Sequence, residues 1–323
     1  MDLRSNPYNP QPGVLPTVMV GRNEQLQYIR MALVRAAANN GGWHPLFVGA
    51  ADMGKTDLLA TAAEIAKEKG YPTVRLEGNA GYGIANDLLE NLKVMLSGFN
   101  DNGAGGKVKL LLSRIRSLQV SAAGVGAGVG LAGETAPVVP FSSLIPDLGE
   151  LMKQKNKVAV FIIDELDNVT KEDMQMILGT MHAINQRRLP IVVIGAGGPG
   201  LPALMTAAKG YAGNFFVNEL KPLGPEDSAK LLAQTGSKSP VTYSEDAINY
   251  LVNECHGNPY LLQLHGFYAW NIAEQFPISL EVAQMAHASS LGKMQPNTLE
   301  LQSALEFVVN AETPTPEMGG GIE

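Results

Sequence analysis

The chain has 323 residues, 45% of them hydrophobic and 17% charged, so it can bury a large core and we expect one large or two modest domains. Its formal charge of −7 does not indicate nucleic-acid binding by the chain as a whole, although a local basic patch stays possible. The single cysteine, Cys255, excludes an internal disulfide and is interpreted as a small core residue. There is no signal-peptide pattern and no apolar run of ~18 to 20 residues, so we expect a cytoplasmic protein without a membrane span.

The first two thirds of the chain alternate between strand and helix signals. Residues 1–19 contain four prolines and are expected to form an extended arm on the surface. A helix should follow, because apolar residues from Leu26 to Ala36 recur at helical spacing. Strands are expected at 43–48, 73–77, 158–163, 190–194 and 215–219, and further helices at 84–97, 107–116, 143–154 and 171–186, besides one that ends at Gly70. This alternation predicts an α/β fold with a doubly wound parallel sheet.

The remainder divides into an insert, a helical domain and a tail. Within the sheet domain, 20–221, we interpret 98–142 as an insert whose glycine-rich part, 118–131, forms a β-hairpin. The low charge of this insert favours a protein contact over a phosphate backbone. Strand signals vanish after residue 221, which predicts a small helical lid domain over 222–292, and the tail, 293–323, is expected to be partly disordered. The lid helices are expected at 225–235, 244–254, 259–274 and 279–291.

The strongest functional signal is a strand, turn and helix between Leu46 and Leu59. Its fixed positions match the phosphate-binding pattern G-x-x-x-x-G-K-[ST], with Gly49, Gly54, Lys55 and Thr56 in place. The glycines let backbone N–H groups turn inward around an anion, and the helix adds the positive end of its dipole. Lys55 would reach the β- and γ-phosphates, and the Thr56 hydroxyl would ligate Mg²⁺. The alternative is a structural glycine turn. The predicted phosphate-binding residues are Gly49, Ala50, Ala51, Asp52, Met53, Gly54, Lys55, Thr56 and Asp57.

A second motif, Phe161-Ile-Ile-Asp-Glu165, places Asp164 at the carboxyl end of a predicted strand. If this strand neighbours the one before the phosphate-binding loop, Asp164 can hold Mg²⁺, usually through water. Glu165 can then polarise a water that attacks the γ-phosphate, so Glu165 and Lys55 are the predicted catalytic residues. The alternative is that both acids lie there only because a strand end emerges into solvent. Asp167 is interpreted as a solvated turn residue and Glu172 as part of a helix cap region.

These motifs, with Val20-Gly-Arg-Asn-Glu24 and Gly257-Asn-Pro-Tyr260, resemble those of AAA+ and STAND-type P-loop ATPases, above all bacterial and archaeal origin-recognition-related ATPases. The similarity covers about residues 6 to 286. It implies that Val20 and Gly21 line an adenine pocket and that Gly257 and Pro259 approach the nucleotide from the lid. It also implies ATP and Mg²⁺ as cofactors. The alternatives are an ordinary helix-opening loop at Gly257 and a choice, for Arg22, between a phosphate contact and a surface charge.

The sequence departs from that family in ways that predict slow hydrolysis. The fourth predicted strand runs into Gly195-Ala-Gly-Gly-Pro199 and lacks the polar residue that usually orients the attacking water. The lid lacks the arginine typical of the family, and between the last two strands only Lys209 could replace an arginine finger, which is worth ~10³ to 10⁵ in rate. Arg187 and Arg188 are assigned to a solvated helix end. No Lys/Arg-rich recognition helix follows the lid, which argues against direct DNA binding.

Three functions remain open at this level. The first is an ATP-binding protein with slow Mg²⁺-dependent hydrolysis, acting as a switch toward a protein partner or another copy of itself through the insert or the lid. The second is an initiator or transposition-helper type of protein that associates with DNA when ATP is bound. The third is a scaffold that keeps nucleotide as a structural ligand without catalysis.

Overall fold

One parallel β-sheet organises the fold. The computed structural model describes residues 5–11, 13–16, 18–79, 83–99, 105–123, 143–208, 215–235 and 241–292. Within these residues the sheet has five strands, β1 (His44–Val48), β2 (Thr73–Glu77), β3 (Ala159–Asp164), β4 (Ile191–Gly197) and β5 (Phe215–Glu219). Their order is β2-β3-β4-β1-β5, and every neighbouring pair is parallel. All the carboxyl ends therefore meet at one edge of the sheet, where ligands bind in open α/β folds.

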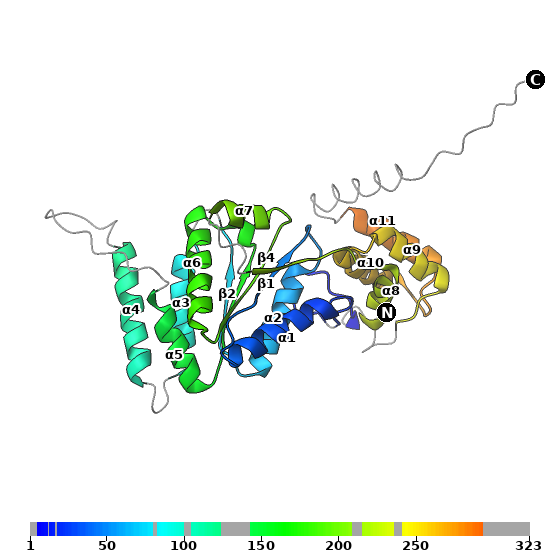
Figure 1. Cartoon of the computed structure of the whole chain (residues 1–323). Coiled ribbons are helices and arrows are strands. Elements are labelled where there is room, and N and C mark those ends of the chain that lie inside the picture. The colour runs from blue at the N-terminus through cyan, green and yellow to red at the C-terminus, as the bar shows by residue number, and fades with distance from the viewer. Residues whose placement is uncertain are drawn as a thin grey trace, which may run out of the picture.

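Helices cover both faces of the sheet, as the doubly wound pattern predicts (Figure 1). One face carries α1 (Asn23–Ala37) and α2 (Lys55–Glu68). The other face carries α3 (Ala85–Ser97), α4 (Gly105–Ala123), α5 (Ile145–Lys155), α6 (Lys171–Arg187) and α7 (Leu201–Ala208). Among the residues placed by the structure, no helix is both long and apolar enough to cross a membrane.

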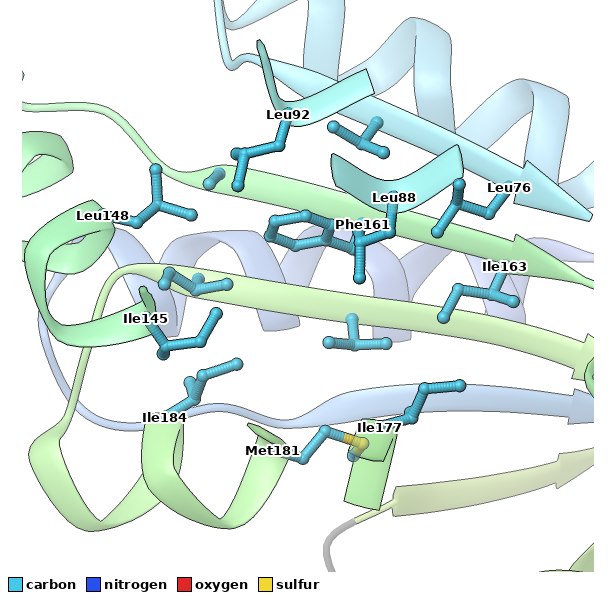
Figure 2. Packing of buried hydrophobic residues seen from close by; sticks show 14 of the residues in the cluster. Leu76, Leu88, Leu92, Ile145, Leu148, Phe161, Ile163, Ile177, Met181 and Ile184 are labelled. Carbon is cyan, nitrogen blue, oxygen red and sulfur yellow. The ribbon is translucent and has the colours of Figure 1, made fainter. Parts of the chain in front are cut away.

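The central strand β3 shows why the chain folds in this way. Its residues alternate between the two cores: Val160 and Ile162 face the helices α1 and α2, whereas Phe161 and Ile163 face the opposite layer. Figure 2 shows Phe161 lying against Leu88 and Leu92 of α3, with side chains of α5 and α6 beside them. Each fully buried side chain of this size contributes about 1.5–3 kcal/mol. The prediction of a strand buried on both faces is confirmed.

The predicted β-hairpin over 118–131 is wrong for residues 118–123. Helix α4 runs from Gly105 to Ala123, so residues 118–123 are helical and not the first strand of a hairpin. The physical reason is that no glycine interrupts the chain between 107 and 123, and Leu, Gln and Ala are good helix formers. The rest of the predicted hairpin, 124–131, lies outside the described residues, as does the tail. The short helix α7 was not predicted.

The helices that follow β5 form a cluster with a hydrophobic core of its own. They are α8 (Pro225–Thr235), α9 (Glu245–Cys255), α10 (Pro259–Ile272) and α11 (Leu280–Leu291), called the C-terminal helices below. Cys255 is buried among them, as expected. The N-terminal arm also enters this core, because Tyr8 is only 3% exposed and its hydroxyl donates to the Leu232 carbonyl oxygen at 2.8 Å. The arm is therefore not confined to the surface. Gly266 makes room for it, since a Cβ there would overlap the Tyr8 ring.

Candidate functional site

The phosphate-binding loop joins β1 to α2, and the two glycines at the fixed positions of its pattern are needed for different reasons. Gly54 lies immediately before α2 with φ +78°, a left-handed conformation that glycine adopts without strain. A Cβ at this position would meet nothing within 4 Å. Gly49 has no such backbone, but a Cβ there would lie 2.9 Å from the Leu220 carbonyl oxygen. The first glycine is thus required by crowding and the second by conformation.

Lys55 is the charged centre of this loop. Its Nζ donates to the carbonyl oxygens of Gly49 at 2.9 Å and Ala50 at 2.6 Å. Burial lowers the pKa of Lys55, and nearby carboxylates oppose that fall. In decreasing order of effect, these carboxylates belong to Asp164, Asp167, Asp52 and Glu165. Asp164 at the end of β3, and Glu165 and Asp167 after it, therefore lie close enough to the lysine to affect its pKa.

Asp164 and Glu165 lie at the end of a strand that does not neighbour β1. The sheet places β4 between β1 and β3, so the condition under which the sequence assigned Asp164 to Mg²⁺, that the two strands are neighbours, is not met. Strand order is set by packing between distant segments, which motif spacing does not encode. Half-buried Asp164 accepts a hydrogen bond from the Glu165 backbone N–H at 2.9 Å. Glu165 is exposed, and its carboxylate accepts from the Asn168 side-chain amide at 2.9 Å.

The last residues of β2 also fix the position of this acidic loop. Gly78 follows β2, and its N–H donates to the Asp164 carbonyl oxygen at 2.8 Å. A Cβ at Gly78 would overlap the Glu165 carbonyl oxygen, so only glycine fits. Glu165 itself has φ +47°, a conformation that side-chain-bearing residues adopt rarely. Strain of this kind is found where surrounding contacts hold a functional residue in place.

Asp167 is not the solvated turn residue that the sequence analysis assumed. It lies in a short 3-10 helix, Leu166–Asn168, and is half-buried. Its Oδ2 accepts a hydrogen bond from the Gly198 N–H at 3.0 Å, just beyond the end of β4. The sequence held one signal for this contact, namely three glycines at the end of the fourth strand. By contrast Glu172 is exposed in the first turn of α6, and Arg187 and Arg188 are exposed at the end of that helix, as predicted.

A cavity of about 310 Å³ lies between the phosphate-binding loop, the N-terminal arm and the C-terminal helices. Of the predicted nucleotide contacts, it is lined by Val20, Asp52, Met53, Gly54, Lys55, Thr56, Asp57 and Pro259. Gly49, Ala50, Ala51, Gly21, Gly257, Asp164 and Glu165 are not part of the lining. Gly21 and Gly257 instead pack against Leu223, and Leu223 N–H donates to the Gly257 carbonyl oxygen at 2.8 Å. These two glycines shape the junction between the sheet and the C-terminal helices.

The cavity also has walls that the sequence analysis missed. The arm contributes apolar residues such as Val14 and Leu15, and α10 contributes Tyr260 and Gln263. The arm is tied to the first turn of α2, because Gly13 N–H donates to Asp57 Oδ1 at 3.2 Å. Burial raises the pKa of Asp57, and this hydrogen bond opposes the rise. No motif marks the arm, so only its proline content hinted at an ordered segment.

Arg22 has a role that neither sequence interpretation anticipated. Its side chain is buried, and its guanidinium donates to the carbonyl oxygens of Met53 and Lys221, each at 3.0 Å. Burial lowers the pKa of Arg22, and Asp227 opposes this shift. The guanidinium thus joins the phosphate-binding loop to the segment that leads into the C-terminal helices.

The strand order, the loop between β1 and α2 and the acids at the carboxyl end of β3 are those of the AAA+ P-loop fold. No protein-family model matches the sequence, and a search of curated proteins found no match. A Walker-type ATPase of Pyrococcus abyssi is similar in structure, with a TM-score of 0.57 and 14% identity over 96% of this chain and 89% of that chain. The Thermotoga maritima RuvB Holliday junction branch migration motor is similar with a TM-score of 0.50 and 13% identity, over 86% and 73% of the two chains. At these identities the likeness concerns the fold alone.

Proposed function

We propose that this protein binds ATP with Mg²⁺ and hydrolyses it slowly, acting in the cytoplasm as a nucleotide-controlled switch toward a protein partner or another copy of itself. One observation carries the proposal: Lys55 lines the cavity and is acted on electrostatically by the carboxylates after β3. The AAA+ fold supports nucleotide binding by the same loop. The switch role rests on the cavity's position between the sheet and the C-terminal helices, where ligand contacts can differ between open and closed arrangements.

The donor atoms suit this ligand. The Thr56 hydroxyl and the Asp164 carboxylate are the hard oxygen ligands that Mg²⁺ prefers, and Mg²⁺ sites in such enzymes use only one or two protein groups plus phosphate oxygens. When bound, the metal neutralises negative charge on the phosphates. Gly54 leaves open space beside the loop, so the backbone can approach a phosphate closely. Lys55 would hold the β- and γ-phosphates, and Glu165 would take a proton from the attacking water.

The expected slowness has a structural counterpart. Arg22 and Lys55 are the basic residues that line the cavity, and the Arg22 guanidinium is committed to two backbone carbonyl oxygens. The walls from the C-terminal helices are Leu231, Pro259, Tyr260 and Gln263, and Leu223 lies just before them; none of these residues carries a positive charge. The described walls of the cavity therefore carry little positive charge that could stabilise the transferred phosphoryl group, so we expect slow hydrolysis.

The test is steady-state phosphate release together with binding of a fluorescent ATP analogue. Lys55→Ala should weaken ATP binding at least about 100-fold, because it removes a buried charge-assisted contact. Glu165→Gln should leave ATP affinity within about 3-fold and lower turnover by at least about 100-fold, the usual effect of removing a general base. Equal phosphate release by wild type and both variants would exclude catalysis at this site. Light scattering with and without ATP then tests the switch.

A second candidate function is ATP-dependent association with DNA. Helix α4 carries Lys107, Lys109, Arg114 and Arg116 and no acidic residue, which makes it basic within an acidic chain. Basic residues that neutralise the phosphates of DNA give an affinity that falls as the salt concentration rises. DNA retention at low ionic strength that requires ATP and is lost when Lys109 and Arg116 are changed to Glu would support this function. No retention at any salt concentration would eliminate it.

A further inference from the structure

The end of β4 carries no side chain at the point where it passes between β1 and β3. Gly195 and Gly197 face the side of the sheet on which Leu166 and Asp167 lie, while Ala196 between them faces the other core. A side chain on either glycine would be crowded. A Cβ at Gly195 would lie 3.1 Å from Leu166 Cδ2, and one at Gly197 would lie 2.6 Å from Asp167 Oδ1. The space beside this strand end is therefore reserved for residues of the loop after β3.

Asp167 fills that space. Its Oδ2 accepts from the Gly198 N–H at 3.0 Å, and its Oδ1 lies over Gly197. A Cβ at Gly198 would lie 2.8 Å from Oδ2, so a side chain there would also displace the carboxylate. The glycines and the aspartate are thus complementary. Gly197 and Gly198 have no side chains, and the Asp167 carboxylate occupies the space where such side chains would lie.

The end of β4 that Asp167 contacts is bonded to the phosphate-binding loop, because the Gly49 N–H donates to the Gly197 carbonyl oxygen at 3.3 Å. Asp167 ranks second, after Asp164 and ahead of Glu165, among the carboxylates that oppose the fall in the pKa of Lys55. Since Coulomb interactions weaken with distance and with exposure, this order agrees with the position that the contacts with Gly197 and Gly198 give to Asp167. Two residues away, exposed Glu165 is held by Asn168. The loop after β3 therefore holds two carboxylates, from Glu165 and Asp167, at the edge of the sheet where the phosphate-binding loop begins.

Resting on the proposed ATPase function, we propose that Asp167 is a catalytic residue that hydrogen-bonds the attacking water from the glycine end of β4. In the step, the water oxygen bonds to the γ-phosphorus while the bond from that phosphorus to the β–γ bridging oxygen breaks, which yields ADP and inorganic phosphate. One water proton passes to the Glu165 carboxylate. Asp167 accepts a hydrogen bond from the other O–H, which directs the oxygen lone pair at phosphorus.

The competing explanation is that Asp167 only holds the loop after β3 against the end of β4. Asp167→Asn separates the two, because the Asn side-chain oxygen can still accept from the Gly198 N–H but the negative charge is gone. Asp167→Ala removes both the hydrogen bond and the charge. Glu172→Gln is the matched control, since this exposed acid of α6 loses its charge away from the cavity.

The experiment compares phosphate release, affinity for a fluorescent ATP analogue and the thermal midpoint for wild type and these variants. We expect Asp167→Asn to lower kcat about 10- to 100-fold while KM, ATP affinity and the thermal midpoint stay near wild type. Asp167→Ala should lose at least as much rate and also melt earlier, and Glu172→Gln should behave as wild type. Wild-type turnover in Asp167→Asn, or a loss confined to KM or stability, would overturn the proposal.

Failure of the proposed function gives a different result. If Lys55→Ala abolishes turnover but Asp167→Asn does not change it, the protein is an ATPase and only the role of Asp167 is refuted. If the wild-type protein binds the ATP analogue and releases no phosphate, hydrolysis itself is refuted, and the role of Asp167 with it.

Discussion

The carboxyl ends of β1 and β4 lie side by side at the same edge of the sheet, and both are rich in glycine, yet the glycines serve opposite purposes. After β1, Gly54 adopts a left-handed conformation with open space around it, so the backbone turns and its N–H groups can face an anion. At the end of β4, Gly197 has no such conformation and is crowded by Asp167 and Leu201. Gly54 shapes the backbone of its own loop, whereas Gly197 makes room for a side chain from elsewhere.

This difference shows that a glycine run has no single meaning. A glycine run points to an anion site when a lysine and an amphipathic helix follow, as they do at Lys55. The same residue type before Pro199 points to close approach by another segment. Substitutions at these two strand ends should therefore damage different properties of the protein, and the expected effects below run from the largest to the smallest.

The largest effect is expected from Gly197→Val. The added side chain would occupy the position of the Asp167 carboxylate and displace the loop after β3. We expect phosphate release to fall at least about 100-fold while affinity for the ATP analogue changes by less than about 3-fold. Gly198→Ala, a smaller intrusion on the same carboxylate, should fall in the same direction and guards against a folding defect. A parallel loss of ATP affinity would show that the end of β4 serves ATP binding, and the contrast with the phosphate-binding loop after β1 would then be wrong.

The contact between β1 and β4 should weaken in acid. His44 of β1 is buried, and its Nδ1 accepts from the Val193 N–H of β4 at 3.0 Å. Burial lowers the pKa of His44 from 6.5 to about 4, so the unfolded chain binds a proton more readily, and stability present above pH 6.5 is lost as the pH falls toward 4. Between pH 6.5 and 5, protonation of this one residue in the unfolded chain should lower the free energy of unfolding by about 2 kcal/mol. Urea unfolding at both pH values measures it.

A control is needed because His265 among the C-terminal helices, with its pKa lowered by burial to about 3, acts in the same direction. His44→Gln should remove only the share that belongs to the contact between β1 and β4 and leave the share of His265. If His44→Gln retained the full loss of stability in acid, the histidine of β1 would not be its source.

A smaller effect is expected from Gly54→Ala. The methyl group meets no atom within 4 Å, but φ +78° costs a side-chain-bearing residue about 1–2 kcal/mol. We expect ATP affinity to fall about 10-fold, since the loop relaxes away from the geometry that suits a phosphate. Binding of the fluorescent analogue measures this loss, and turnover at saturating ATP should be much less affected. A rate loss at saturation without an affinity loss would contradict the contrast with Gly197.

The smallest effect is expected from Gly200→Ala. This glycine precedes α7, has no positive φ and would place its Cβ in open space. Affinity, turnover and the thermal midpoint should all stay within error of wild type. A measurable change there would mean that the whole segment after β4 is sensitive, and the effect of Gly197→Val could no longer be assigned to Asp167.

Local signals in the sequence predicted the elements well. The strands at 73–77 and 215–219 and the helix at 225–235 have the predicted bounds, because alternation and helical spacing are properties of short stretches. The pattern around Lys55 identified the loop for the same reason. The predicted roles of Glu165, Thr56 and Asp164 in catalysis and metal binding stay predictions until the variants are measured.

What the sequence could not supply depends on contacts between distant segments. The position of β4 between β1 and β3 joins residues that lie far apart along the chain. The same holds for the Gly198 contact of Asp167, 31 positions away, and for the Leu232 contact of Tyr8, 224 positions away. Helix α4 was cut short because small and apolar alternation was assigned to strands, although nothing before residue 124 stops a helix.

The burial of Tyr8 has a consequence for how the protein is made. Its hydroxyl partners, the Leu232 carbonyl oxygen and the Tyr243 hydroxyl, are synthesised 224 and 235 residues after Tyr8. Tyr8 therefore cannot take its buried position until α8 has been synthesised. During translation the sheet can assemble first, as N-terminal regions generally do, but the arm reaches its place over the cavity only when α8 and α10 exist to receive it.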